Sequence, residues 1–530
     1  MRPSRKLLAA LLATTLLAPM AGHAATTPDD AQSLQTQLHD WLADLIGPLL
    51  PAGVQPVTVT SDGDGFRLRV ESPAALDAYV PHGSAVSLRA TKIDGGRWAL
   101  DDAAFPSPLT ITLPFAVQPT ATATTTTAPA APGTPPGQSL TVTPQASVTS
   151  SAPTMSTIML NSDKSIYHGI FDPALTTESH FETQTDGVRS VGKDSETSAA
   201  HGESSSRWEK LSADGRMTIH TASSSDRIHQ HFVQPNGVAA DVDWARSTSN
   251  NQINGLSPAR LREAIQALSP LLASGNKPGV TPEQSAQWHR FIDAVFDLAN
   301  SMESQSELSG GSFRMGNTVV SAKTIHVGAQ LGAPEGIVSF GLRMDLQGLD
   351  SPSVPPGVWQ ELMPHAVIIA PRLGGISRER LHQFLLDAVD GANAPDPQKA
   401  RADIVARMIA SGVSIGIDEL AFSLGPTKLE GAGAMEITGP QKVTATADVT
   451  AHNLDQLLAR AAKEPQLAQA VPVLTLARGL GKPEGDVTRW HIDVRNNAVL
   501  INGFDLSALM QRPAAPPAGG PATLAPAQPR

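Results

Sequence analysis

Long parts of the chain alternate between apolar and polar residues with a period of two, which is the pattern of β-strands with one apolar face. The alternation is clearest at 318–327 and 337–346, and a similar pair of stretches spans 413–437. Asp-Gly and Asn-Gly pairs elsewhere in the chain predict hairpin turns. The pattern therefore predicts an α+β, β-rich fold built on an antiparallel sheet.

The N-terminal part combines one helix with hairpins. Leucines and a tryptophan between Leu34 and Leu50 recur at helical spacing and form one apolar stripe. A helix on a membrane surface and a helix packed on a sheet would both show this stripe, but the polar face carries no Lys or Arg to meet anionic headgroups. Packing on a sheet is the favoured interpretation. The strands of that sheet are expected at 57–60, 66–70, 86–90 and 98–100.

The region from 156 to 250 is polar and alternating, which suits long antiparallel strands with one wet face. Turns are predicted at Asp186-Gly187, Asp214-Gly215 and Asn236-Gly237. Successive strands of one meander are expected at 217–221, 228–232 and 238–244.

A weak internal repeat follows. Four times a strand-like stretch runs into a short turn that opens a Leu-rich segment, with turns starting at Gly255, Gly375, His452 and Gly503. A Ser or Asp in each turn is expected to cap the helix by accepting a hydrogen bond from a free amide. The spacings are irregular, so the repeat indicates duplication and no solenoid.

Composition sets the expected boundaries. No charged residue lies between Asp102 and Asp163, and the later part of this interval is mainly Thr, Ala, Pro and Ser, which is too poor in large apolar groups to fold. The expected segments are a signal peptide (1–24), a small α+β N-terminal unit (25–118), a Thr/Pro/Ala-rich disordered linker (119–153), a polar antiparallel meander (154–253), an α+β repeat-like region (254–511) and a disordered Pro/Ala tail (512–530).

The first residues indicate export. Arg2, Arg5 and Lys6 precede an apolar or small run from Leu7 to Ala18, and Gly22-His23-Ala24 supplies the small residues of a cleavage site. Cleavage after Ala24 and a periplasmic location are expected. The run is too short to cross a bilayer, and no later stretch approaches the roughly 20 apolar residues of a spanning helix. The mature chain is therefore expected to have no transmembrane segment.

Charge and cysteine content narrow the chemistry. The 530-residue chain has a net charge of -11 and 0 Cys. The lack of Cys excludes disulfides, thiolate nucleophiles and Cys-ligated zinc. An acidic chain has no electrostatic attraction for nucleic acid or anionic lipid. We expect no nucleic-acid partner and no cofactor.

One motif suggests a hydrolase. Gly412-Val-Ser414-Ile-Gly416 matches the Gly-x-Ser-x-Gly motif, in which a strand precedes the serine and a helix follows it. Here the pattern before the motif is helical and the pattern from Val413 is strand-like. The order is reversed, so no catalytic role is expected for Ser414.

Two patterns resemble metal sites. His229 and His231 lie two apart on a predicted strand and share a face, where His180 or His220 would complete a zinc or copper site. Solvated histidines on the wet face are the simpler interpretation. Asp62-Gly-Asp64-Gly65 is better explained as a hairpin turn than as a calcium loop, because an oxygen ligand is missing at Phe66. No metal site is predicted.

The C-terminal stretches at 447–457, 490–494 and 497–503 resemble exported bacterial proteins of a family of unknown function. That family is similar in style to the YdgA-like and AsmA-like envelope proteins. The resemblance covers 254–510 and implies a long curved antiparallel sheet. It implies no functional residue.

Two function classes remain, and both are non-enzymatic. In the first, a curved sheet with an apolar inner face binds a lipid or another hydrophobic small molecule, and the runs 366–370 and 471–480 line the groove. In the second, the core is closed and the protein is a periplasmic structural or interaction module for envelope proteins. A hydrolase using Ser414 is the third option. If the first class is correct, one concave face of the sheet should hold nine alternating apolar residues. They are Ile325, Val327, Val338, Phe340, Leu342, Ile415, Ile417, Phe422 and Leu424.

Overall fold

The computed structural model describes residues 27–46, 55–72, 84–115, 154–173, 177–210, 215–234, 237–273, 281–354, 363–439, 442–463, 471–495 and 498–506. The predicted signal peptide, linker and tail lie outside these residues. The six domain boundaries stay predictions.

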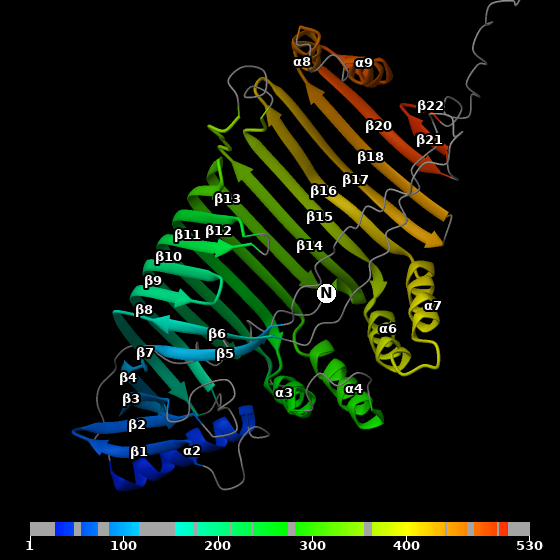
Figure 1. Ribbon diagram of the computed structural model, residues 1–530. Helices are drawn as coiled ribbons and strands as arrows, with labels where there is room; N and C mark the ends of the chain where they lie inside the picture. The colour runs from blue at the N-terminus through cyan, green and yellow to red at the C-terminus, as the bar shows by residue number, and fades with distance from the viewer. Residues whose placement is uncertain are drawn as a thin grey trace, which may run out of the picture.

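The described strands form one antiparallel sheet of 22 strands, which curves as a long open surface (Figure 1). Its first part contains β1 (Val57–Asp62), β2 (Gly65–Glu71), β3 (Ala85–Lys92), β4 (Trp98–Ala104), β5 (Leu109–Phe115), β6 (Thr154–Asn161), β7 (Lys164–Asp172) and β8 (Thr177–Val191). The long central strands are β9 (Ser195–Lys210), β10 (Met217–Val233), β11 (Ala239–Leu256), β12 (Ser301–Met315), β13 (Thr318–Gly332) and β14 (Ile337–Gln347). The last part contains β15 (Ala366–Ser377), β16 (Val413–Leu424), β17 (Thr427–Gly439), β18 (Lys442–His452), β19 (Lys482–Glu484), β20 (Val487–Arg495), β21 (Ala498–Ile501) and β22 (Phe504–Asp505). The β-rich α+β prediction is confirmed.

Seven described helices accompany the sheet. They are α2 (Pro28–Ile46), α3 (Pro258–Ala273), α4 (Pro282–Phe296), α6 (Arg378–Gly391), α7 (Pro397–Ala410), α8 (Leu454–Ala461) and α9 (Val471–Leu480). Figure 1 shows α3, α4, α6 and α7 in a row along one end of the strands, with α8 and α9 near the other end. No described helix lies across the centre of the sheet.

The tightest core lies under α2, at the N-terminal end of the sheet. Leu34, Leu38 and Leu42 form the buried stripe of α2, and they pack on buried side chains of β1–β4, β7 and β8. Lys92 Nζ donates to Asp30 Oδ1 at 2.5 Å and lowers the pKa of that carboxyl, which fixes the first turn of the helix to β3. The helix therefore packs on a sheet, as the absence of Lys and Arg from its polar face indicated.

Strands β5 and β6 pair with each other across the predicted linker. Leu109 lies opposite Leu160, and Phe115 lies opposite Thr154. The strands on the two sides of residues 116–153 therefore belong to one hairpin of one continuous sheet.

A crease of residues with positive φ crosses the central strands. Gly187 on β8, Arg227 on β10, Gly310 on β12 and Gly348 after β14 have φ between 51° and 63°. The pairs around them place these residues in one line, alternating with Ala200, Ala245 and Lys323 of the strands between. A left-handed residue turns a strand locally, as in a β-bulge, so an aligned row bends all the strands at one level.

The crease explains two wrong predictions. Asp186-Gly187 was expected to be a turn, but Gly187 lies inside β8. Residues 217–221 and 228–232 were expected to be two strands, but both belong to β10, because Arg227 takes a positive φ without reversing the chain. Strands β10 and β11 do pair as neighbours, and the amide of Gly237 donates to the carbonyl of Gln234, whereas Asn236 of the predicted turn lies outside the described residues.

The predicted helix caps are confirmed at two of the four repeats. The hydroxyls of Ser257 and Ser377 accept hydrogen bonds from the amides of Arg260 and Arg380. The third repeat differs, because Asn453 precedes α8 without a side-chain cap and Asp455 pairs with Arg478 on α9. The fourth repeat enters β22, and its expected helix lies outside the described residues.

Candidate functional site

The register of the central strands aligns apolar side chains on one face of the sheet. Directly opposed residues of antiparallel strands point to the same face, as do residues two apart on one strand. Val327 lies opposite Met344, Met344 opposite Ile369, and Ile369 opposite Leu420. Each such line of opposed residues across the strands is a row, and we call the set built from four rows on β13–β16 the apolar floor. Strand by strand, it consists of Ile325, Val327, Ala329 and Leu331, then Phe340, Leu342, Met344 and Leu346, then Val367, Ile369, Pro371 and Leu373, then Ile415, Ile417, Leu420 and Phe422.

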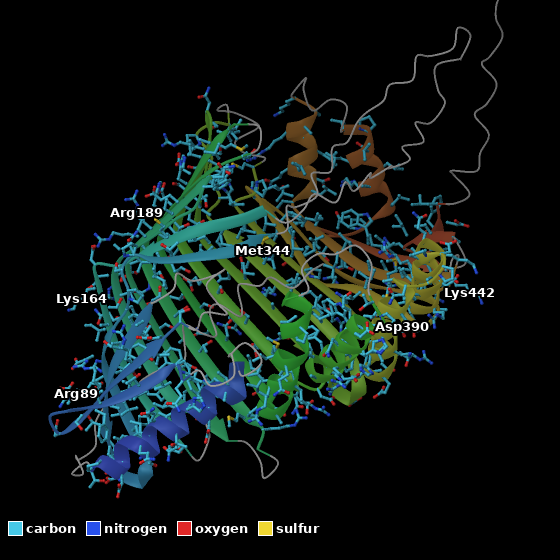
Figure 2. The ribbon with its side chains drawn as sticks, turned by 60° about the horizontal axis from the view of Figure 1, so that its bottom comes forward. Arg89, Lys164, Arg189, Met344, Asp390 and Lys442 are labelled. Atoms are coloured by element: carbon cyan, nitrogen blue, oxygen red, sulfur yellow. The ribbon has the colours of Figure 1, made fainter. Side chains whose placement is uncertain are left out.

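Many side chains of the apolar floor keep a large exposed fraction. Val327, Leu331, Phe340, Leu342, Met344, Leu373, Ile415 and Ile417 are each 38–45 % exposed. By contrast, Leu68 and Leu100 under α2 are at most 1 % exposed. Figure 2 shows Met344 in the middle of the sheet, whereas Asp390 lies among the helices at its end. The apolar floor is thus an open surface among the described elements.

The opposite face of the same strands is charged. Arg343 Nη1 pairs with Glu419 Oε2 at 2.5 Å, and Arg372 Nε pairs with Asp418 Oδ1 at 3.1 Å. On the neighbouring strand β17, the hydrogen bond from Lys428 lowers the pKa of Glu430, which favours the ionised carboxylate on this same face. A sheet with one charged face normally buries its other face against a second layer. Here the charged face is exposed, and none of the described elements forms a second layer over the centre of the apolar face.

Helices cover the apolar face at both ends of the sheet. At the N-terminal end α2 covers Phe181, which lies in the same row as Leu342 by the register of β8 to β14. At the C-terminal end α8 packs Leu454 on Trp490 and Ala451, and Trp490 Nε1 donates to the carbonyl of Ala477 on α9 at 2.7 Å. The open part therefore lies between two closed cores.

The size of the apolar floor suits an aliphatic chain. Neighbouring strands are about 4.8 Å apart and residues on one face repeat about every 6.6 Å, so the floor measures roughly 14 Å across the strands and 20 Å along them. One leaflet of the hydrocarbon core of a bilayer is about 15 Å thick. An exposed contiguous apolar surface marks an interaction site in a folded protein.

All nine residues predicted to share one face do so by register. Seven belong to the apolar floor, and Val338 and Leu424 lie one same-face position beyond it along β14 and β16. Sequence reasoning missed Leu331, Met344 and Leu373, although each continues the alternation of its own strand. Of the run 366–370, only Val367 and Ile369 belong to the apolar floor, because a strand turns every second residue to the other face. The run 471–480 forms α9 at the sheet end, where Val473 is 67 % exposed.

Ser414 does not lie on a nucleophile turn. Helix α7 precedes it and β16 follows it, as the sequence predicted. Its partner across the ladder is Gly374 of β15. The hydrolase motif is therefore the start of a strand.

Each histidine of the pair contacts its own aspartate. His229 Nδ1 lies 2.7 Å from Asp243 Oδ1, and His231 Nδ1 lies 2.7 Å from Asp241 Oδ1. His220 is nine residues away along β10, roughly 30 Å in an extended strand. His180 lies level with His220, since both pair with Arg207. The four histidines therefore do not converge, and within the described residues no three His, Asp or Glu side chains are grouped to hold a metal ion.

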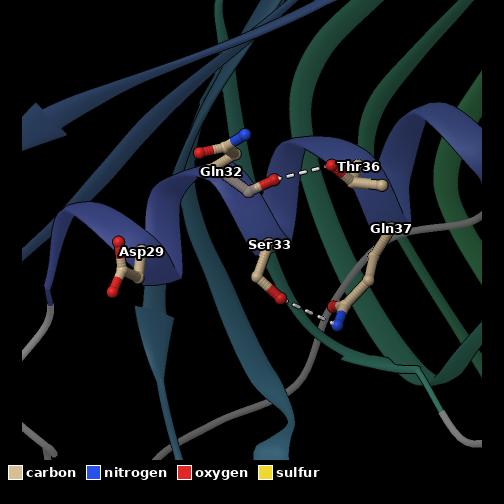
Figure 3. A pocket seen from close by; sticks show the side chains of 5 residues that line it. All are labelled: Asp29, Gln32, Ser33, Thr36 and Gln37. Carbon is tan, nitrogen blue, oxygen red and sulfur yellow. Dashed lines mark hydrogen bonds between the residues drawn. The ribbon is translucent and has the colours of Figure 1, made fainter.

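An open depression of about 490 Å³ lies on the solvent-facing side of α2 (Figure 3). The residues that line it are of polar types, and the hydrogen bonds drawn there stay within the helix, from Thr36 to the carbonyl of Gln32 and from Gln37 to Ser33. It brings no acid, base or nucleophile together with a partner from another element.

The turn that resembled a calcium loop holds its carboxylates in ion pairs. Asp62 pairs with Arg67, and Asp64 pairs with Arg89.

No described helix is long and apolar enough to span a membrane. No curated protein and no solved structure matches the chain. A family model described as "Uncharacterized protein conserved in bacteria (DUF2125)" matches residues 227–509, which is more than half of the chain and includes the whole apolar floor. The chain belongs to this family of uncharacterized bacterial proteins.

Proposed function

We propose that this protein is an exported, periplasmic, non-enzymatic protein that binds the acyl chains of a lipid on the apolar floor. The observation that carries the proposal is the open patch of sixteen apolar residues on four adjacent strands, with many side chains about two-fifths exposed. The signal peptide predicted at 1–24 supports a location in the envelope, where lipids are abundant.

Burial of an aliphatic chain would supply enough free energy for binding. Each buried methylene contributes about 0.8 kcal/mol, so a chain of about sixteen carbons with half of its surface covered gains on the order of 6 kcal/mol before the costs of association. Two chains on one lipid would add to this gain. Because the apolar floor has no charged side chain, the gain is not offset by desolvation of charge.

A dye titration tests the proposal. An environment-sensitive apolar dye should bind the mature protein saturably, and oleate or a dioleoyl phospholipid should displace it. Phe340→Glu places a charge on the apolar floor and should abolish binding. Gly341→Glu is the matched control, because position 341 lies on the other face of β14 with open space around it. Absence of binding in the folded wild-type protein would refute the proposal and favour a module that interacts with envelope proteins.

A further inference from the structure

The four rows of the apolar floor continue onto β9–β12, where most of their side chains become uncharged and polar. Ala329 lies opposite Ser304, Ser304 opposite Asn251, and Asn251 opposite Thr221. Val327 lies opposite Ser306, which continues to Ser249 and Ser223. We call this set the hydroxyl floor. It consists of Ser204 and Ser206, then Thr221, Ser223 and Ser225, then Ser247, Ser249 and Asn251, then Ser304 and Ser306. Ser206 is only 2 % exposed and lies opposite the buried Phe181, so it marks the closed end of this floor.

Hydrogen bonds organise the hydroxyl floor across its strands. Asn251 Nδ2 donates to Thr221 Oγ1 at 3.2 Å, and Ser304 Oγ donates to Asn251 Oδ1 at 2.6 Å. Ser306 Oγ donates to Ser249 Oγ at 3.2 Å. A hydroxyl has one donor and two acceptor sites, so these bonds leave acceptor capacity toward a ligand.

The hydroxyl floor carries no charged residue, whereas the other face of the same strands does. Arg207, Asp226, Arg246 and Glu303 alternate with the floor residues and point away from them. A surface that only needed to be soluble would carry charges on either face. The segregation indicates that this face meets a polar but uncharged group.

We infer that the sheet binds an amphiphile whose acyl chains lie on the apolar floor and whose uncharged, hydroxyl-rich headgroup, such as a hexose, lies on the hydroxyl floor. This inference rests on the proposed function. An anionic headgroup is bound most strongly by Arg or Lys side chains, and the hydroxyl floor contains neither. A sugar presents donors and acceptors together, as Ser, Thr and Asn side chains do.

Four further residues complete the chemistry of this face. Met302, Ile253 and Ile219 continue the row of Phe340 and Leu331 along the hydroxyl floor, on the side of α3. Trp208 ends this row, and its Nε1 donates to Ser206 Oγ at 3.1 Å. Acyl chains that lie across the strands would therefore contact these apolar side chains beside the hydroxyls. An indole beside hydroxyls offers an apolar body with a polar edge, which suits the face of a sugar ring.

The test compares lipids that share their chains and differ in their headgroups. Monogalactosyl dioleoylglycerol, dioleoylphosphatidylglycerol and dioleoylglycerol are titrated against the mature protein by native mass spectrometry. We expect the galactolipid to bind about tenfold tighter than either of the others, since two or three net hydrogen bonds give a factor of this order. Ser223→Lys places a cation on the hydroxyl floor and should reverse the preference toward phosphatidylglycerol. Ser224→Lys, on the other face of β10, should leave it unchanged.

The outcomes separate the two proposals. Equal affinity for the three lipids, or a preference of the wild type for phosphatidylglycerol, overturns the inference and leaves acyl-chain binding standing. An unchanged preference in Ser223→Lys, measured beside a folded control, also overturns it. No binding of any lipid overturns the proposed function as well.

Discussion

Truncation of one aromatic side chain distinguishes an open apolar floor from a closed core. Phe340 and Phe181 are both phenylalanines on the same face of the sheet, but they differ in cover. Phe340 lies on the apolar floor and is 38 % exposed, whereas Phe181 lies in the core under α2 and is 3 % exposed. The substitutions Phe340→Ala and Phe181→Ala therefore form a matched pair.

The expected losses of stability differ by a factor of about three. Phe→Ala in a closed core costs about 3–5 kcal/mol, because a cavity remains. Full burial of a phenylalanine contributes about 1.5–3 kcal/mol, so the part of Phe340 that is buried accounts for roughly 1–2 kcal/mol. No cavity term applies to Phe340→Ala, because solvent fills the space above an open floor.

Urea unfolding followed by circular dichroism measures both variants in lipid-free protein. We expect Phe181→Ala to lower the midpoint far more than Phe340→Ala. A loss for Phe340→Ala as large as that for Phe181→Ala would show that the apolar floor is the inside of a closed core, and the reasoning from exposure would be wrong.

Three further predictions concern the crease, one histidine and the hairpin of β5 and β6. Gly310→Ala should destabilise the protein by about 1–3 kcal/mol, because φ is +59° and the new Cβ would lie 2.8 Å from that of Ala245. Gly341→Ala, which has open space and an ordinary φ, is the control, and equal urea midpoints for the two variants would contradict the prediction. A hydrogen bond to Asp186, and to a smaller extent one to Glu203, raises the pKa of His201 above 6.5. The stabilisation by protonated His201 is therefore complete below pH 6.5 and is lost as the pH rises through the raised pKa. The fall in melting temperature from pH 6 to 8 should be smaller in His201→Gln than in wild type, and an identical fall would argue against this linkage. Protease cleavage within 119–153 should give two fragments on a denaturing gel that elute as one species in native gel filtration, since β5 and β6 remain paired; separate elution would exclude that pairing.

The sequence predicted strands better than it predicted their partners. The alternation around Val327 and Phe340 depends on nearest neighbours along the chain, so strand positions and their apolar faces could be read directly. Arg227 could not be identified, because nothing in its side chain demands a positive φ and its alignment with the glycines of the crease appears only in the register of the sheet. Asp186-Gly187 shows the same limit, since Asp-Gly suits a turn and a creased strand equally well.

The hydroxyl floor was missed for a related reason. Its serines alternate visibly along each strand, at Ser204 and Ser206 and again at Ser247 and Ser249. Only the register shows that these rows meet the rows of Val327 and Ala329 on one face. Register depends on pairing between strands far apart in the sequence, which a single sequence does not specify.

The most direct measurement of the central claim is the lipid content of the protein isolated from its native envelope. The mature wild-type protein, Phe340→Glu and Gly341→Glu are purified in parallel and analysed by native mass spectrometry, followed by extraction and identification of bound lipids. We expect acyl lipid bound to wild type and Gly341→Glu, and none bound to folded Phe340→Glu. Folded wild-type protein without lipid, or equal lipid on all three proteins, would contradict it.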